Sequence, residues 1–168
     1  MVIVVVPASG QTSPSDITLE DYERFNQLKL RIRPIGTEMV RYIRASPLHQ
    51  NLSETVRSKD CMIHLYEIFE GFEDKFGAIT SLVGLAANMR DHEDRQLTTK
   101  VLNLHAREFL ASAPLVMRII DNRTKMSGCS QDGAVVAKSQ EMKSTLKDIQ
   151  MTLVPIAKRV GAKTSRHD

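Results

Sequence analysis

The chain has 168 residues, of which 42% are hydrophobic and 26% are charged, and its net charge is +3. This length suits one globular domain with its own hydrophobic core, and the composition excludes a disordered chain. The small net charge gives no support to nucleic-acid binding, so nucleic acid is not an expected partner. Few aromatic, glycine and proline residues favour helices over a β-sandwich or a barrel.

Residues 1–17 differ in character from the rest of the chain. The run VIVVV at positions 2–6 is followed by a stretch rich in Pro, Gly and Ser. The run is too short for a signal peptide or a membrane span, and Val2 excludes N-myristoylation. We therefore predict an extended N-terminal arm and linker, either docked on the domain or donated to a partner as a strand.

Residues 18–45 carry the pattern of an amphipathic helix. Thr18 precedes two acidic residues, which is typical of an N-cap and a first helical turn. Apolar residues then recur in steps of three and four. They are Tyr22, Phe25, Leu28, Ile32, Ile35, Met39 and Ile43. Pro34 and Gly36 predict a kink, with a clean break as the alternative.

A second helical pattern occupies residues 47–90. Ser46 and Pro47 have the form of an N-cap and a first helical residue. The apolar positions are Leu48, Leu52, Val56, Ile63, Tyr66, Phe69, Phe72, Phe76, Ile79, Val83 and Met89. Because Gly71 and Gly77 lie within this pattern, two interpretations remain open: one very long helix, or two helices with their boundary near Gly71–Gly77.

Two further helices follow a polar junction at residues 90–94. The third runs to about Arg123, with a kink expected at Pro114, and its apolar stripe includes one acid, Glu108. The stripe is Leu97, Val101, Leu104, Glu108, Leu115 and Ile119. Residues 124–133 are the clearest loop in the chain. The last helix has the most regular seam, typical of a bundle or coiled coil, at Ser139, Met142, Leu146, Ile149, Leu153, Ile156 and Val160.

These elements predict an all-α fold, an antiparallel up-down four-helix bundle about 45 Å long, with five helices if residues 47–90 divide. The bundle occupies residues 18–161, and residues 162–168 form a C-terminal tail.

The chain offers few residues for catalysis. Cys61, His64 and Glu67 share one side of a helix, but a nucleophile and its base usually come from different elements. His105 and Glu108 repeat the His-x-x-Glu spacing, in the reverse order of di-metal bundles and without an inward Glu on the first and last helices. A Glu paired with Lys or Arg explains Glu108 more simply. We expect a protein that is not an enzyme and that has no metal and no cofactor.

The two cysteines, Cys61 and Cys129, show no metal-binding spacing. Two cysteines suffice for one disulfide, but free thiols in a reducing compartment are the favoured interpretation. Cys129 is expected to be exposed in its loop. A cytoplasmic location is therefore expected.

Two groups of residues are candidates for a binding surface. Phe69, Phe72 and Phe76 most simply fill the core, but a chain turn at Gly71 would leave one or two of them exposed with a charged rim, as at an interaction site. Basic residues of the last helix form the second candidate, a basic surface. They are Lys138, Lys143, Lys147, Lys158 and Arg159.

The function expected from these features is non-enzymatic. We expect an adaptor or scaffold bundle that binds a helix or segment of a partner protein in a groove between helices. Long bundles of this outline occur in cytoskeletal linkers, which is an analogy of fold alone. The alternative is a peripheral membrane-binding or membrane-remodelling bundle, which would use the basic last helix and the apolar N-terminal arm on an anionic membrane surface. The oligomeric state is not predicted.

Overall fold

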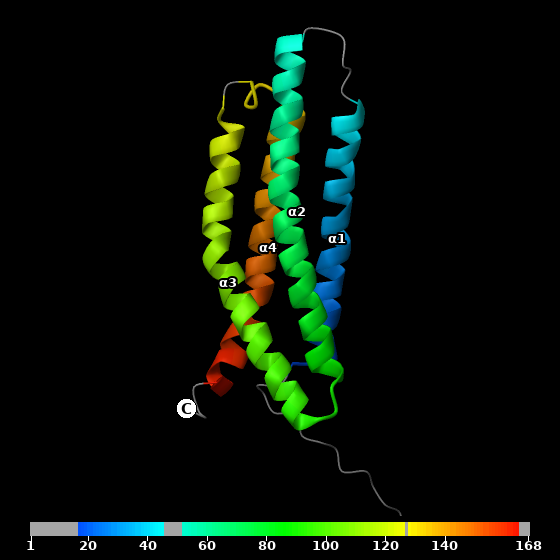
Figure 1. The fold of residues 1–168 in the computed structure, drawn as a ribbon, viewed down its shortest axis with the longest axis vertical. Helices are drawn as coiled ribbons and strands as arrows, with labels where there is room; N and C mark the ends of the chain where they lie inside the picture. Colours follow the sequence, from blue (N-terminus) through cyan, green and yellow to red (C-terminus); the bar gives the residue numbers. More distant parts are fainter. Residues whose placement is uncertain (1–16, 46–51, 127, 165–168) are drawn as a thin grey trace, which may run out of the picture.

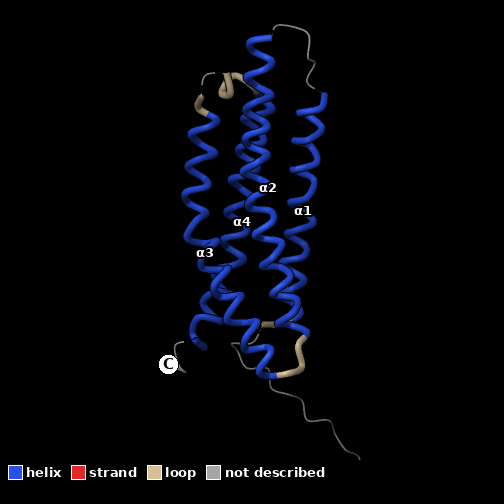
Figure 2. Tube along the Cα trace, viewed as in Figure 1, coloured by secondary structure: helices blue, strands red, loops and turns tan. Residues whose placement is uncertain are grey.

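The computed structural model describes residues 17–45, 52–126 and 128–164, and the side chains of 52–58 and 162–164 are excepted. These residues form four helices: α1 (Leu19–Ala45), α2 (Leu52–Asn88), α3 (His92–Thr124) and α4 (Gly133–Thr164). Figure 1 shows them side by side and alternating in direction, and Figure 2 shows helices and loops without a strand in this part of the chain. The predicted all-α four-helix bundle is confirmed.

Three predictions fall outside the described residues, wholly or in part. They are the arm at residues 1–16, the helix start at Ser46 and Pro47, and the tail, of which residues 165–168 are not described while α4 continues to Thr164. Ile17, which ends the predicted arm, is described and is buried against the core.

Helix α2 is one continuous element of 37 residues, about 55 Å long at 1.5 Å per residue. The interpretation as two helices is therefore wrong, because Gly71 and Gly77 both lie inside α2. Helix α1 likewise continues across Pro34, which excludes a clean break there. Four long helices thus suffice to enclose the core.

Polar side chains accept hydrogen bonds from the backbone amides at the helix starts, which have no partner within the helix. Thr18 caps α1 as predicted: its Oγ1 accepts a hydrogen bond from the Asp21 amide at 3.2 Å, and Asp21 Oδ2 accepts from the Thr18 amide at 2.9 Å. Asp91 Oδ1 accepts from the Asp94 amide at the start of α3. Asp132 Oδ1 accepts from the first amides of α4. Each carboxylate also faces the positive end of a helix dipole.

Phenylalanines of α1 and α2 form the centre of the core. Phe25 stacks on Phe76 with ring centroids 5.6 Å apart, and Phe69 meets Phe72 edge-on at 5.0 Å. All four are buried, so the core interpretation of Phe69, Phe72 and Phe76 is confirmed. A Cβ on Gly36 would lie 2.7 Å from Cε1 of Phe69, which shows how closely α1 approaches α2 at this point.

The cysteines form a disulfide between α2 and the loop that joins α3 to α4. The Cα atoms of Cys61 and Cys129 are 5.7 Å apart, within the range of a disulfide. The prediction of free thiols is wrong, and so is the prediction that Cys129 is exposed, because this residue is buried. The start of α2 and the α3–α4 loop lie at the same end of the bundle because neighbouring helices run in opposite directions (Figure 1).

A matched pair of glycine substitutions tests the close packing of α1 on α2. We expect Gly36→Ala to lower the free energy of unfolding by about 1–3 kcal/mol, because the buried Phe69 ring has no room to move away. Gly71→Ala is the control: a Cβ there meets nothing within 4 Å, so it raises the free energy by up to about 1 kcal/mol through helix propensity. Urea unfolding measures both, and equal effects would contradict the packing.

Reduction tests the disulfide. The cross-link joins positions 68 residues apart and restricts the unfolded chain, so it stabilises the fold by about 4 kcal/mol. We expect a reducing agent, or the double change Cys61→Ala and Cys129→Ala, to lower the urea midpoint accordingly. A midpoint that reduction leaves unchanged would show that the cross-link does not contribute.

Candidate interaction surface

Helix α3 is apolar on two opposite faces, and the bundle buries one of them. The buried face contains several small or polar residues alongside larger apolar ones. It consists of Thr99, Leu102, Asn103, Ala106, Phe109, Ala113 and Ile120. The opposite face points away from the other helices and remains in solvent.

The exposed face carries five large aliphatic side chains, which we call the outer stripe. They are Leu97 (64% exposed), Val101 (37%), Leu104 (66%), Leu115 (57%) and Ile119 (38%). Their spacings of four, three, eleven and four residues keep them on one side of the helix. In the sequence these residues form the apolar pattern of the third helix, but they do not face the core. The period of 3.6 residues holds for both faces, so the pattern alone does not show which face is buried.

Glu108 lies in the middle of the outer stripe. Its side chain is exposed, and its Oε1 lies 3.5 Å from Nζ of Lys75 on α2. Pairing with a lysine was expected at this position. Since both groups are in solvent, the pair contributes at most about 1 kcal/mol.

Four basic residues of α3 run along one flank of the outer stripe. They are Lys100, Arg107, Arg118 and Lys125, all exposed, and none of them forms an ion pair with another described residue. This flank faces α4: a Cβ on Gly161 of α4 would lie 3.1 Å from Nη2 of Arg107.

Asp121 marks the point where this flank meets α4. Its Oδ1 accepts a hydrogen bond from Nζ of Lys143 at 2.6 Å, and that bond, with the charges of Lys143, Lys125 and Lys147, holds the pKa of Asp121 below its usual value. Lys158 follows Lys147 by eleven residues, three helical turns, and lies on the same side of α4. We call the six exposed cations the basic edge. They are Lys100, Arg107, Arg118, Lys125, Lys147 and Lys158.

The structure divides the predicted basic surface of the last helix into two parts. Lys138 pairs with Glu38 and Arg159 with Asp21, so these two cations face α1. The other three, Lys143, Lys147 and Lys158, lie toward α3, where Lys143 is paired and the other two join the basic edge. The sequence shows the cations, but their partners on other helices depend on the packing.

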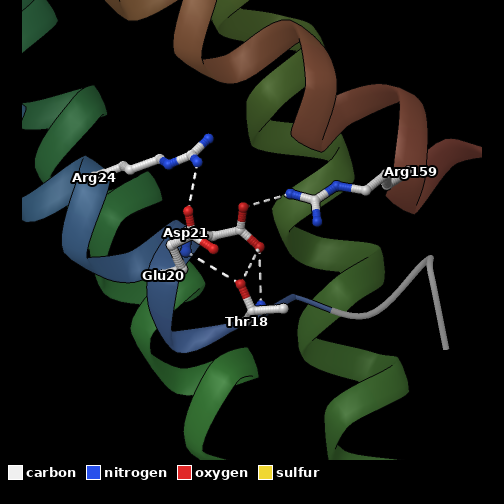
Figure 3. A network of polar contacts seen from close by, with 5 residues as sticks. All are labelled: Thr18, Glu20, Asp21, Arg24 and Arg159. Carbon is white, nitrogen blue, oxygen red and sulfur yellow. Dashed lines mark hydrogen bonds and ion pairs between the residues drawn. The ribbon is translucent and has the colours of Figure 1, made fainter. Parts of the chain in front are cut away.

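Polar contacts join α1 to α4 along their whole length. Three ion pairs and one hydrogen bond follow each other in antiparallel register. They are Asp21 with Arg159 (2.5 Å), Arg31 with Asp148 (3.2 Å), Glu38 with Lys138, and the Tyr42 hydroxyl donating to Asp132 (2.5 Å). Figure 3 shows the first pair, in which one Asp21 carboxylate accepts from Arg159 and from the Thr18 cap.

A groove of about 930 Å³ runs between α1 and α4. Its floor includes Phe25, Leu28 and Ile156, all buried, and its rim is charged. Met151 is the large apolar lining residue that is well exposed, at 66%. The groove therefore offers a partner much less apolar surface than the outer stripe does.

Cys61, His64 and Glu67, which share one side of α2, do not form a nucleophile–base contact. Cys61 is in the disulfide, and His64 Nδ1 lies 3.9 Å from Glu67 Oε2, too far for a hydrogen bond. Within the described residues no three His, Cys, Asp or Glu side chains are placed to hold a metal ion.

No family model matches the chain, and searches of the curated proteins and of the solved structures found no match. Among the described helices, none has the length and hydropathy needed to cross a membrane.

Acidification tests the Asp21 contacts. Burial alone would raise the pKa of Asp21, but hydrogen bonds from Arg159 and Thr18 outweigh it and lower the pKa below 3.8. The carboxylate therefore stabilises the fold above pH 3.8, and this stability is lost as the pH falls through the folded-state pKa. We expect Asp21→Asn to lower stability at neutral pH and to make it less sensitive to pH below 3.8. Urea unfolding measures this, and equal pH dependence in both proteins would contradict it.

Proposed function

We propose that the protein is a non-enzymatic adaptor that binds a helix of a partner protein through the outer stripe of α3. The observation that supports this proposal is the second apolar face of α3, since its five aliphatic residues lie outside the core cluster and its three leucines are more than half exposed. Apolar side chains gathered on one exposed face of a folded domain are typical of an interaction site.

The dimensions of the outer stripe suit a helix as partner. From Leu97 to Ile119 it spans about 33 Å at 1.5 Å per residue, roughly six helical turns. Its leucines stand at helical spacing, which matches anchors at the same spacing on a second helix. Full burial of a leucine side chain is worth about 1.5–3 kcal/mol, so the three leucines of the stripe supply about 4.5–9 kcal/mol, from which the cost of association is subtracted.

The proposal places the partner outside α3, whereas the sequence favoured a groove between helices. The α1–α4 groove is the weaker candidate, because ion pairs such as Asp21 with Arg159 bridge it and its apolar floor is covered. The disulfide between Cys61 and Cys129 supports an oxidising compartment as the place of function, instead of the cytoplasm.

A second candidate function is binding to an anionic membrane surface. The observation in its favour is the basic edge beside the outer stripe, since an apolar face flanked by lysine and arginine is typical of helices that lie on membranes. Glu108 makes membrane binding less favourable, because its carboxylate would enter the apolar layer of the membrane together with the stripe.

Site-specific photo-crosslinking in the cells that make the protein tests the proposal. A photoreactive residue replaces Leu104 or Leu115 in the outer stripe, and Gln27, which lines the α1–α4 groove, is the matched control. We expect the same protein to be cross-linked from both stripe positions and not from Gln27, because both stripe residues lie under one partner helix. Mass spectrometry identifies the product. Cross-links from Gln27 alone, or from no position, would contradict the proposal.

A further inference from the structure

We infer that the partner of the outer stripe is an acidic amphipathic helix, which packs its apolar side chains on the stripe and places its carboxylates over the basic edge. The inference rests on the proposed function and names the chemistry of the partner. It follows from how the charges are arranged beside the exposed leucines.

On α3, each leucine of the outer stripe is followed three residues later by a cation. Lys100 follows Leu97 by three residues, Arg107 follows Leu104 by three, and Arg118 follows Leu115 by three. Three residues on a helix place the cation about one turn further and always on the same flank. A partner helix that docks on the leucines therefore meets a row of positive charge along one of its edges.

The basic edge carries more cations than nearby anions. Two acids lie on this side of α3: Asp121, which already accepts the hydrogen bond from Lys143, and Glu93, which stands seven residues before Lys100 in the first turn. The lowered pKa of Asp121 agrees with a positive potential around it, to which Lys125 and Lys147 contribute. The opposite flank of the stripe carries one acid, Asp94, and one cation, Arg123, near the two ends of α3. A partner helix with carboxylates along one edge places them over the cations of the basic flank, and the other flank requires no charge from it.

A second copy of this chain is a poor occupant. In an antiparallel pair of α3 helices each flank faces its own equivalent, so Lys100, Arg107 and Arg118 would face like charges. In a parallel pair the basic flank faces the opposite flank, where Asp94 is the one acid of α3. Neither arrangement neutralises the basic edge.

A bilayer is also a poorer occupant than an acidic helix. A helix lying on a membrane has cations on both sides of its apolar face, whereas here the row of cations is on one side. Glu108, which is paired with Lys75, would also have to enter the acyl region.

Two synthetic peptides test the inference. Both are helical 25-residue sequences with leucine at core-facing heptad positions; one carries glutamate at the flanking positions and the other lysine. We expect the purified protein to bind the acidic peptide at least about tenfold more tightly in fluorescence anisotropy. The preference should decrease with added salt, because the contacts with the basic edge are in solvent.

Reversing two charges on α3, and two on α1 as a control, tests whether the basic edge causes the preference for the acidic peptide. Lys100→Glu with Arg118→Glu should weaken the acidic peptide about tenfold or more and strengthen the basic one. The control, Lys29→Glu with Arg41→Glu on α1, changes the net charge by the same amount and should alter affinity less than about twofold. Circular dichroism confirms that both variants are folded. Leu104→Glu should abolish binding of both peptides.

Each alternative gives a different result. Equal affinity for both peptides, or binding of neither, overturns the acidic partner, and so does binding to phosphatidylserine vesicles in preference to the acidic peptide. Dimerisation in sedimentation that Leu104→Glu abolishes overturns it in favour of a second copy. A cross-linked partner without an acidic helix would leave the proposed function standing and refute this inference, whereas absence of any cross-link would refute the proposed function itself.

Discussion

The packing of α2 against its neighbours is the interaction on which the rest of the structure depends. Phe69 lies over Gly36 of α1, Phe76 stacks on Phe25, and the same helix contacts α3 along its other side. These contacts bring the helices close together and leave each of them one face for the core. A helix that is apolar on two faces must then leave one in solvent. Helix α3 is that helix, and its outer stripe follows from the geometry of the bundle.

The surfaces of the bundle are specialised in different ways. Between α1 and α4, ion pairs such as Asp21 with Arg159 join the first and last helices, and this seam contributes to the fold. The side chains of the outer stripe, by contrast, lie outside the core cluster. The basic edge lies between these two regions and is largely unpaired. The outer stripe, which is apolar, charged on one side and outside the core, is therefore the surface that we propose for binding.

Sequence periodicity predicted those parts of the fold in which each helix has one apolar face. The steps from Tyr22 to Ile43 identify the buried side of α1, and the seam from Ser139 to Val160 identifies that of α4. For α3 the same reasoning selected the wrong face, because Ala106 and Ala113 of the core face give a weak signal and the leucines of the outer stripe a strong one. The disulfide was missed because its cysteines are neighbours through topology and not through spacing. The cations of the basic edge were visible, but the partners of Lys138 and Arg159 were not.

The measurement that tests this account most directly is the stability of a variant with Leu97, Leu104 and Leu115 all changed to glutamine. If the outer stripe lies outside the core, each change affects the free energy of unfolding by no more than about 0.5 kcal/mol, and urea unfolding of the variant stays close to that of the original protein. If these leucines were part of the core, each would cost about 2–5 kcal/mol and the variant would unfold. That result would contradict the existence of a free apolar face on α3 and, with it, the proposed binding surface.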